Sequence, residues 1–480
     1  MKGVLPVYTR KTKIVCTIGP ASDSPEMLRK LILGGMNVAR MNFSHGTHEG
    51  HKKVADTIKR LRTELGRPVA LLLDTRGPEI RIKTFAEGRI ELVSGQTFTL
   101  TTQDIEGTKE RVSITYAQLP AYVGTGTRIL IDDGLIELTA ETVTDTEIIC
   151  RVINGGIVSN RKGVNIPGVD THMPFMDEKD RQDLQFAYEN DVDFVALSFV
   201  QSAEDIVQAR EYLAEFGPSR CELIAKIENA EGVENADEIL RVADGLMVAR
   251  GDLGIEIPFE ELPAIQKRLI KRCYMAGKKV ITATQMLESM IQNPRPTRAE
   301  VTDIANAIHD GTSAIMLSGE TAGGKYPLEC LETMVKIALQ TEASIDYKEI
   351  FTKVAVESGN NITNAICHAT CTSAHDLDAK AIVALSIGGK TARMISRFRP
   401  ETPIIVVSPL IKTVYQMALC WGVVPLLGED KSTPDEMMKS AVQKIKEAGL
   451  AGICDLLVIT GSTSPEITFT NAIQVHIIDD

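Results

Sequence analysis

Eight short apolar runs recur along the chain, and the segments between most of them show the i, i+3, i+4 spacing of amphipathic helices. The runs are KIVCTIG (13–19), NVARMNF (37–43), VALLLD (69–74), DFVALSF (193–199), ELIAKIE (222–228), GLMVARG (245–251), KVITATQ (279–285) and AIMLSG (314–319). Near-continuous apolar strands that alternate with helices are typical of parallel sheets covered on both faces. Eight such units predict a closed (β/α)8 barrel, the TIM barrel of the α/β class.

Two regions depart from this rhythm. Residues 78–170 alternate apolar and polar positions with Gly and Asp-Gly turns, as in TRILIDDGLIELTA. We expect an inserted small β-barrel domain here, placed to act as a lid on a barrel formed by residues 1–77 and 171–342. A new strand–helix series, which includes AIVALS, TPIIVVS and LLVITG, predicts a C-terminal α/β domain of about five strands over residues 343–480.

The overall charge and composition exclude several classes of protein. The 480 residues carry a formal net charge of −12, which disfavours binding to nucleic acid or to an anionic membrane. No run approaches the roughly 18 apolar residues of a membrane-spanning helix, and the N-terminus lacks the apolar core of a signal peptide. The nine cysteines are scattered without a CxxC motif, so we expect reduced thiols in a cytoplasmic protein.

Each predicted barrel strand ends in polar or charged residues. They are Thr17, Arg40 and Asn42, Asp74, Ser198, Lys226 and Glu228, Arg250 and Asp252, Thr284, and Ser318 with Glu320. One polar residue at a strand end is ordinary, but eight strand ends in register are not. Because a (β/α)8 barrel assembles its active site from the C-terminal ends of the strands, the pattern predicts an enzyme site at that mouth.

The charged members of this set indicate phosphoryl transfer assisted by a divalent cation. Glu228 and Asp252 lie on adjacent strand ends, and one or two carboxylates with water and substrate oxygens suit Mg²⁺. Lys226 and Arg40 would supply positive charge beside that ion, as transfer of a phosphoryl group requires. The segment GDLG (251–254) adds backbone N–H groups for an anion. The alternative is that Lys226 and Glu228 only form a salt bridge.

Two further assignments at the mouth stay open. A monovalent cation would suit Asn42, Ser44, Asp74 and Thr75, which offer one carboxylate among neutral oxygens. Thr284 either relays a proton through water or packs as a β-branched core residue. Composition alone does not decide between these alternatives.

Two glycine-rich segments resemble P-loops without matching the motif. GETAGGKY (319–326) has Tyr326 where Ser or Thr is needed, and SIGGKT (386–391) has Ala384 in place of the first glycine. The second segment forms either a phosphate site for an effector, remote from the barrel, or a plain βα turn. Its candidate residues are Ser386, Gly388, Gly389, Lys390 and Thr391.

One cysteine cluster also has two interpretations. Cys367, Cys371 and His375 recur every four residues in CHATCTSAH, which places them on one face of a helix. Three such ligands can hold a metal, although no fourth ligand lies nearby in the sequence. The alternative is that the thiols pack on the buried side of the helix.

Eight longer motifs closely resemble those of pyruvate kinase. They are ARMNFSHG (39–46), LDTRGPEIR (73–81), RKGVNIPG (161–168), AKIENAEG (225–232), ARGDLGIEIP (249–258), ATQMLESM (283–290), PRPTRAE (294–300) and MLSGETAGG (316–324). They follow the family's order and span the barrel and lid, whereas the C-terminal region matches more loosely. The resemblance implies that phosphoenolpyruvate and ADP are converted to pyruvate and ATP, with Mg²⁺ (or Mn²⁺) and K⁺ as cofactors.

The resemblance also implies roles for residues at the mouth. Glu228 and Asp252 would hold the divalent ion, and Lys226 would stabilise the phosphoryl group in transit. Arg40 would bind phosphate, and Thr284 would belong to the route that protonates the enolate. The implied substrate-binding set is Arg40, Lys226, Gly251, Asp252 and Thr284.

The monovalent ion and the nucleotide are assigned in the same way. The implied K⁺ ligands are Asn42, Ser44, Asp74 and Thr75, and the implied nucleotide contacts are Arg40, Asn42, His45 and Lys162. Lys162 would reach the nucleotide from the lid. Family members that depend on K⁺ carry Glu at the position of Glu79, whereas independent members carry Lys, so we expect K⁺ dependence.

Members of the family are commonly homotetramers regulated through the C-terminal domain. SIGGKT falls where their effector-phosphate loop lies, but Pro465 and Glu466 replace the Gly-rich loop of sugar-bisphosphate binders. Because a carboxylate repels phosphate, AMP or a sugar monophosphate rivals fructose 1,6-bisphosphate as the expected effector. We expect none of the additional phosphohistidine-type domain that some bacterial members carry.

Two other functions remain open on the sequence. One is a Mg²⁺-dependent lyase that forms a pyruvate enolate and cleaves or condenses C–C bonds on the same barrel. The other is a non-catalytic relative that senses metabolites. The lid residue Lys162 and the placement of Lys226 beside the metal ligands favour phosphoryl transfer over both.

Overall fold

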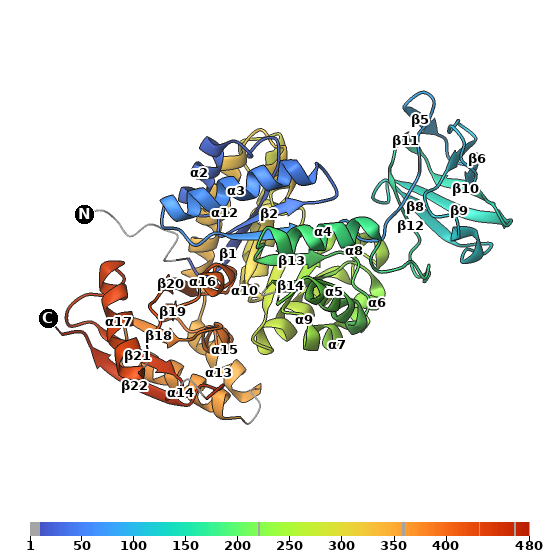
Figure 1. Ribbon diagram of the computed structural model, residues 1–480. Helices are drawn as coiled ribbons and strands as arrows, with labels where there is room; N and C mark the ends of the chain where they lie inside the picture. The colour runs from blue at the N-terminus through green and yellow to red at the C-terminus, as the bar shows by residue number, and fades with distance from the viewer. Residues whose placement is uncertain (1–9, 219–220, 358–360, 432, 465–466, 480) are drawn as a thin grey trace.

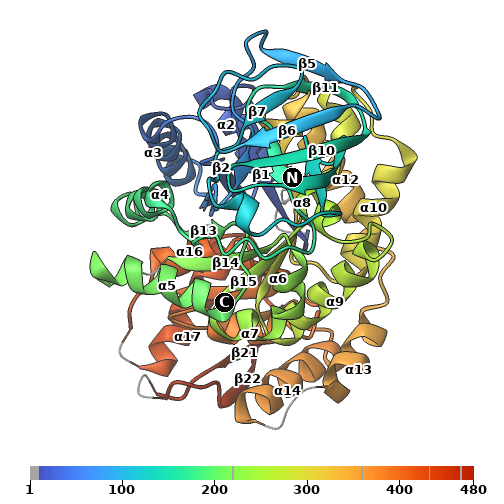
Figure 2. The same ribbon diagram turned by 90° about the vertical axis from the view of Figure 1, so that its right-hand side faces the viewer.

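The molecule has a central barrel, with an all-β insert at one end and a C-terminal domain at the other (Figure 1). The computed structural model describes residues 10–218, 221–357, 361–431, 433–464 and 467–479. Figure 2 shows the same arrangement from the side of the insert. The two end regions therefore approach opposite ends of the barrel.

The eight predicted barrel strands all form, and they close in the order β1-β17-β16-β15-β14-β13-β3-β2. Their bounds are β1 Lys13–Ile18, β2 Val38–Asn42, β3 Ala70–Asp74, β13 Phe194–Leu197, β14 Glu222–Ile227, β15 Gly245–Ala249, β16 Lys279–Ala283 and β17 Ala314–Leu317. All pairings are parallel, including the closing pair β1–β17 with Lys13 opposite Ala314. Residues pointing to either side of these strands are buried, which explains why the runs are apolar without alternation.

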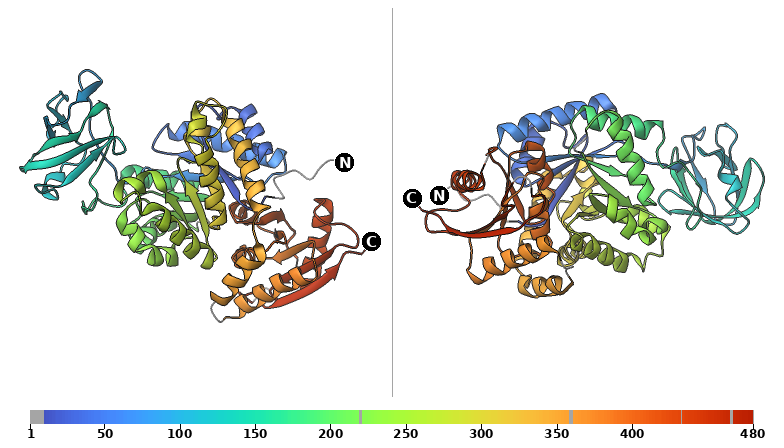
Figure 3. Two further views of the ribbon diagram at one scale, coloured as in Figure 1. Left: turned by 180° about the vertical axis from the view of Figure 1, so that it is seen from behind. Right: turned by 60° about the horizontal axis from the view of Figure 1, so that its bottom comes forward.

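Helices surround the barrel, as the right-hand view of Figure 3 shows. Their bounds are α2 Pro25–Gly34, α3 His48–Glu64, α4 Glu178–Glu189, α5 Ala203–Glu215, α6 Ala230–Glu234, α7 Ala236–Val242, α8 Arg250–Glu256, α9 Leu262–Met275, α10 Arg298–His309, α11 Gly319–Ala322 and α12 Pro327–Glu342. A short 3-10 turn, η2, spans Glu288–Ile291. Helices α4, α5 and α10 begin with capping boxes, in which the first-turn acid and the cap residue satisfy each other's backbone N–H groups.

The interior of the barrel is a packed apolar core. Residues such as Val15, Leu72, Phe194 and Met247 come from different barrel strands, belong to one cluster and are at most 1% exposed. Leu419 of the C-terminal domain joins the same cluster and is fully buried. The C-terminal domain therefore plugs the N-terminal end of the barrel, and the polar strand ends lie at the opposite mouth.

The insert leaves the barrel after β3 and returns before α4. Its strands are β4 Ile80–Arg81, β5 Arg89–Leu92, β6 Thr97–Thr101, β7 Arg111–Ser113, β8 Arg128–Ile131, β9 Ile136–Val143, β10 Glu147–Asn154, β11 Gly156–Ser159 and β12 Gly163–Asn165, with the 3-10 turn η1 at Leu119–Ala121. Seven strands form one sheet in the order β4-β12-β8-β9-β10-β6-β7, and β11 pairs with β5. Both sheets share one apolar core, which includes Phe98, Leu138 and Val158.

The C-terminal domain contains the predicted five-stranded sheet, in the order β20-β19-β18-β21-β22. Its elements are α13 Tyr347–Glu357, α14 Ile362–Asp376, β18 Ala381–Leu385, α15 Lys390–Ser396, β19 Ile404–Ser408, α16 Ile411–Met417, β20 Val423–Leu427, α17 Pro434–Glu447, β21 Leu456–Gly461 and β22 Ala472–Ile477. The edge strand β22 is antiparallel to β21. In the described part of the chain, no helix is long and apolar enough to cross a bilayer.

The cysteine cluster of α14 packs into the core of this domain. Cys367 and Cys371 are 0% and 3% exposed and lie in one cluster with Phe398, whereas His375 is exposed. Among the described residues, no group of three or more His, Cys, Asp or Glu side chains is arranged to hold a metal. The metal interpretation is therefore wrong, and packing of small thiols accounts for this spacing.

Candidate active site at the barrel mouth

A buried ammonium group lies at the centre of the mouth. Lys226, near the end of β14, is 8% exposed and donates a hydrogen bond to Ser198 Oγ at 2.6 Å. Its Nζ lies 3.0 Å from Asp74 Oδ1 and 3.0 Å from Glu228 Oε1. These partners come from three strand ends, so barrel closure itself assembles the group. Lys226 therefore does more than pair with Glu228, because two further strands hold it in place.

Asp74 connects this lysine to a second cation. Arg40 Nε donates to Asp74 Oδ2 at 2.6 Å, and the same guanidinium donates to Thr17 Oγ1 at 2.8 Å. Burial alone would raise the pKa of Asp74, but Arg40 and then Lys226 outweigh it and lower that pKa. Burial likewise opposes the charged form of Lys226, yet Asp74 and Glu228 raise its pKa. The ion pairs with Asp74 and Glu228 thus favour the charged form of Lys226.

Glu228 and Asp252 form a carboxylate pair with unusual acidity. Burial, the charge of Asp252 and that of Asp74 raise the pKa of Glu228 to about 7, although Lys226 opposes them. Burial also raises the pKa of Asp252, against the attraction of Lys226 and a hydrogen bond with Glu228. Two carboxylates at adjacent strand ends suit a divalent cation, which would take its remaining ligands from substrate and water. The pair fits Mg²⁺ or Mn²⁺.

Thr284 follows β16 with a strained backbone. Its φ of 69° lies in the left-handed region, which β-branched residues rarely adopt. The hydroxyl accepts a hydrogen bond from Gly251 N at 2.8 Å and donates to Ala283 O at 2.6 Å. Arg250 donates to the Thr284 carbonyl at 2.5 Å and forms an ion pair with Asp303. Such strain is typical of functional positions, and the half-buried side chain is not a core residue.

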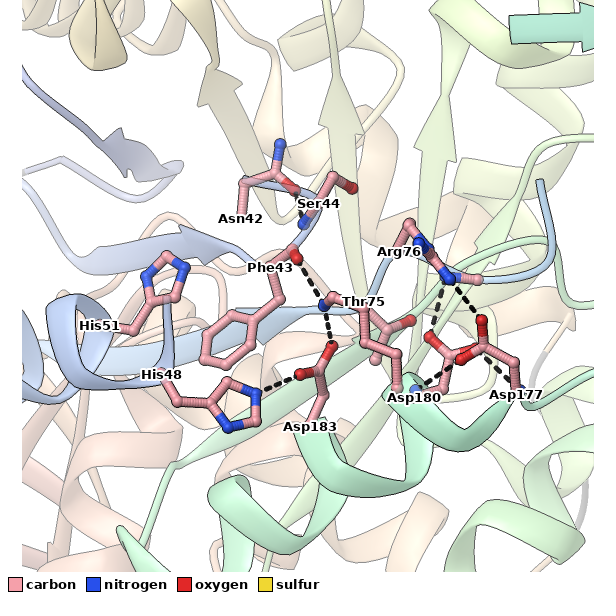
Figure 4. Close-up of polar contacts among 12 residues, drawn as sticks. Asn42, Phe43, Ser44, His48, His51, Thr75, Arg76, Asp177, Asp180 and Asp183 are labelled. Atoms are coloured by element: carbon pink, nitrogen blue, oxygen red, sulfur yellow. Dashed lines mark hydrogen bonds and ion pairs between the residues drawn. The ribbon is translucent and has the colours of Figure 1, made fainter. Parts of the chain in front are cut away.

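The four residues predicted to hold a monovalent ion lie at the ends of β2 and β3. Asn42 pairs with Asp74 across these strands. Asn42 Oδ1 accepts a hydrogen bond from Ser44 N at 3.1 Å, and Thr75 Oγ1 accepts one from Ser198 N at 3.1 Å. Figure 4 shows Asn42, Ser44 and Thr75 near one another. All four residues thus lie at the ends of two paired strands, and their binding of a monovalent ion stays a prediction.

Two of the residues predicted to contact the nucleotide, His45 and Lys162, have other partners in the structure. His45 is exposed, and its carbonyl accepts a hydrogen bond from His51 Nε2 at 2.8 Å. Lys162 pairs with Asp132 of the insert itself at 2.7 Å. Glu79 pairs with Arg81 at 2.7 Å, and its charge also raises the pKa of Asp252. The start of the insert therefore places the Glu79 carboxylate near Asp252.

Three residues at the mouth were not assigned a role from the sequence. Thr17 and Ser198 orient the two cations, and their strand-end positions were the available signal. Gly77 begins the path to the insert with φ +71°, and a Cβ there would lie 2.7 Å from the Cβ of Ser198. Only glycine allows the chain to turn this close to the partner of Lys226.

The predicted effector residues line a separate cavity of about 290 Å³ in the C-terminal domain. Ser386, Gly388, Lys390 and Thr391 line it, and the Thr391 hydroxyl lies 2.8 Å from that of Thr470. Gly389 is the N-cap residue of α15, has φ +74° and is buried against Met417. The predicted departure at Pro465 and Glu466 lies outside the described residues.

The fold is that of a (β/α)8-barrel enzyme, with buried charged residues clustered at the barrel mouth and a β domain inserted after β3. Residues 9–331 match the family model of the pyruvate kinase barrel domain, and residues 364–476 match that of the pyruvate kinase alpha/beta domain. The chain belongs to the pyruvate kinase family of glycolytic enzymes. The comparisons therefore support neither a lyase nor a non-catalytic relative.

Known relatives cover nearly all of the chain. It is 50% identical over 474 residues to a pyruvate kinase of Geobacillus stearothermophilus, and 49% identical over 474 residues to one of Sporosarcina psychrophila. Each alignment covers 98% of this chain and 81% of the relative. A pyruvate kinase crystal structure from Cryptosporidium parvum superimposes with a TM-score of 0.93 at 39% identity, covering 98% of this chain and 97% of that one.

Proposed function

We propose that this protein transfers the phosphoryl group of phosphoenolpyruvate to ADP, with Mg²⁺ or Mn²⁺ held by Glu228 and Asp252. The observation that carries the proposal is the buried ammonium of Lys226, fixed between Asp74 and Glu228 at the barrel mouth. A cation fixed at the mouth by three strand ends would stabilise a phosphoryl group during transfer.

In the proposed reaction, a terminal phosphate oxygen of ADP forms a bond to phosphorus as the bond from phosphorus to the enol oxygen breaks. The enolate keeps that electron pair, and a proton added to its methylene carbon gives pyruvate. Lys226 and Arg40 hold the phosphoryl oxygens, and Asp74 holds both cations in place. A divalent ion held by Glu228 and Asp252 would neutralise negative charge that develops on the substrate. Thr284, held by Gly251, belongs to the proton route.

The same proposal assigns the second cation and the nucleotide. K⁺ binds at Asn42, Ser44, Asp74 and Thr75, whose oxygens gather at two neighbouring strand ends. His45, Arg40 and Asn42 contact ADP. The insert acts as a lid, and Lys162 exchanges its partner Asp132 for the nucleotide phosphates when the lid closes.

The C-terminal domain is proposed to be regulatory. The cavity lined by Ser386, Gly388, Lys390 and Thr391 offers hydroxyls, a backbone turn and a cation for a phosphorylated effector. The enzyme is expected to be a cytoplasmic homotetramer. Sedimentation at several protein concentrations tests the assembly, and titration with AMP, a sugar monophosphate or fructose 1,6-bisphosphate identifies the effector.

The decisive test is pyruvate formation from phosphoenolpyruvate, ADP and Mg²⁺, with KCl compared with tetramethylammonium chloride at equal ionic strength. We expect turnover that requires ADP, Mg²⁺ and K⁺. Release of pyruvate without ADP would favour a lyase. Turnover without K⁺ would leave the reaction intact but contradict the monovalent site. Absence of turnover from folded protein, with each candidate effector present, would contradict the proposed function.

A further inference from the structure

Helix α4 contacts both chain segments that connect the barrel to the insert. Its cap residue Asp177 follows the returning segment directly and forms an ion pair with Arg76 on the outgoing segment. Asp180, in the first turn, accepts a hydrogen bond from Gly77 N at 3.0 Å. Asp180 is 2% exposed, so this contact is shielded from water. Figure 4 shows Arg76, Asp177 and Asp180 clustered at this point.

The first two turns of α4 also hold the loop that follows β2. Lys179 Nζ donates to the Phe43 carbonyl at 2.7 Å and to Asp183 Oδ2 at 2.8 Å. The other oxygen of Asp183 lies 2.6 Å from Nε2 of His48, in the first turn of α3. Asp183 is fully buried, and removing either partner would leave its charge poorly compensated. We call Lys179, Asp183 and His48 the α4 clamp.

Aromatic packing around Phe43 also holds this loop. The Phe43 ring is 2% exposed, stacks on His51 at 4.1 Å between centroids, and meets Phe186 of α4 edge to face at 5.1 Å. His51 in turn donates to the His45 carbonyl. Phe43 lies between Asn42 and Ser44, so its backbone position sets where those two residues and His45 can lie (Figure 4).

We infer that the α4 clamp is a positioning device for the reaction, which fixes the loop 42–47 for cation and nucleotide binding and links it to the lid connections. The inference rests on the proposed function of Asn42, Ser44 and His45. None of the three clamp residues is placed in contact with a reacting atom. They act through the Phe43 carbonyl and the start of α3. Arg40 and Lys226 are held by Asp74 instead, so phosphoenolpyruvate binding is largely independent of the clamp.

The test compares Lys179→Met with Lys53→Met. Lys53 also forms an i,i+4 ion pair, with Glu49, but both side chains are at least three-quarters exposed. We expect Lys179→Met to raise the K⁺ concentration for half-maximal activity, and the KM for ADP, by about tenfold, as loss of an outer-shell partner does at metal sites. The KM for phosphoenolpyruvate should change less than twofold. Lys179→Arg should restore most of the loss.

A second readout does not depend on turnover. Amide hydrogen exchange over residues 42–47, measured with KCl and with tetramethylammonium chloride, reports how firmly the loop is held. We expect faster exchange in Lys179→Met than in Lys53→Met, and a smaller slowing by K⁺. Asp183→Asn should behave like Lys179→Met if it folds.

The two hypotheses fail in different ways. If the wild type turns over but Lys179→Met matches Lys53→Met in K⁺ response, ADP response and exchange, the clamp inference is wrong and the proposed function stands. If the KM values for both substrates rise equally, the effect is a general loss of structure and the inference is also wrong. If the wild type shows no turnover, the proposed function fails, and unchanged exchange in Lys179→Met would overturn the clamp separately.

Discussion

Charged side chains are buried at both ends of the barrel, but their partners differ. At the base, Lys279 begins β16, is 1% exposed and forms an ion pair with Glu222 at the start of β14. Glu222 also forms an ion pair with Arg393 of the C-terminal domain, with 3.3 Å between Arg393 Nη1 and Glu222 Oε1. Asp193, before β13, is fully buried between Arg62 at 3.0 Å and Lys412 at 3.2 Å. Acids at the base are thus held by cations from the barrel helices, strands and C-terminal domain.

At the mouth, carboxylates outnumber the cations that contact them. The carboxylates of Asp74, Glu228 and Asp252 crowd around Lys226 and Arg40. Three carboxylates therefore face two cations, and burial, together with the neighbouring carboxylates, raises the pKa of Glu228 and of Asp252 despite the attraction of Lys226. A charge network completed by the protein is structural, whereas one that lacks positive charge is ready for an added cation. Burial of charge alone therefore does not mark an active site.

The largest expected difference between the two ends concerns catalysis. Lys226→Met should lower phosphoryl transfer about a thousandfold, because a preorganised charge is lost where negative charge develops. Enolate protonation of pyruvate, followed as deuterium exchange of its methyl group by NMR, should remain largely intact. Lys279→Met should keep its kcat but lower the unfolding free energy, on the order of 3 kcal/mol for a broken buried pair.

This comparison has clear contrary outcomes. Equal loss of phosphoryl transfer and enolate protonation in Lys226→Met would refute the division of labour between Lys226 and Thr284. A large fall in kcat for Lys279→Met, measured per mole of folded enzyme, would show that the base is not merely structural. Circular dichroism of both variants before assay separates misfolding from lost chemistry.

A smaller effect is expected from adding positive charge at the mouth. Glu79 lies close enough to raise the pKa of Asp252, so Glu79→Lys would replace a repelling charge with an attracting one. We expect activity in tetramethylammonium chloride to rise at least about tenfold, towards the value in KCl. The introduced ammonium group would take over the charge of K⁺, and a stabilisation of about 1–2 kcal/mol corresponds to a rate increase of this size. A variant that needs K⁺ as much as its parent would contradict the role of Glu79. Glu91→Lys, an exposed change on β5, is the matched control.

The barrel and the centre of its mouth could be predicted from sequence, and the reasons are local. Each barrel strand is apolar on both faces, and parallel pairing brings strand ends together, so Arg40, Asp74, Lys226 and Glu228 could all be predicted to lie at one mouth. The ion pairs of Asp74 with Arg40 and Lys226 were not predicted, because the sequence assigned Asp74 to the monovalent ion. The α4 clamp was not predicted, because Asp183 and His48 are 135 residues apart and meet only through the path of the insert. In the sequence, Lys179 and Asp183 show only the spacing of an ordinary surface ion pair.

The ion pairs at the N-terminal end of the barrel were not predicted for a related reason. Charges at strand starts resemble charges at strand ends until their partners are known, and those partners come from distant parts of the chain. The Lys13 ammonium, for example, donates to the Val423 carbonyl, 410 residues away. Sequence periodicity predicted the five strands of the C-terminal domain, but it could not show that Leu419 closes the barrel.

The smallest predicted effect concerns stability at the base and leaves catalysis unchanged. Burial, and then the charge of Arg10, lower the pKa of Lys13 to about 8. Between pH 8 and the ordinary lysine pKa of about 10.4, the unfolded chain holds a proton that the folded protein has released, so stability should rise with pH in this window. Below pH 8 the burial penalty is present in full. Between pH 7.5 and 9.5, the unfolding free energy of the wild type should therefore rise by on the order of 1–2 kcal/mol relative to that of Lys13→Met. The denaturation midpoints of the two proteins should then approach each other as the pH rises. A constant difference across that range would mean that Lys13 keeps its proton, because the Val423 carbonyl compensates its charge more fully than burial opposes it.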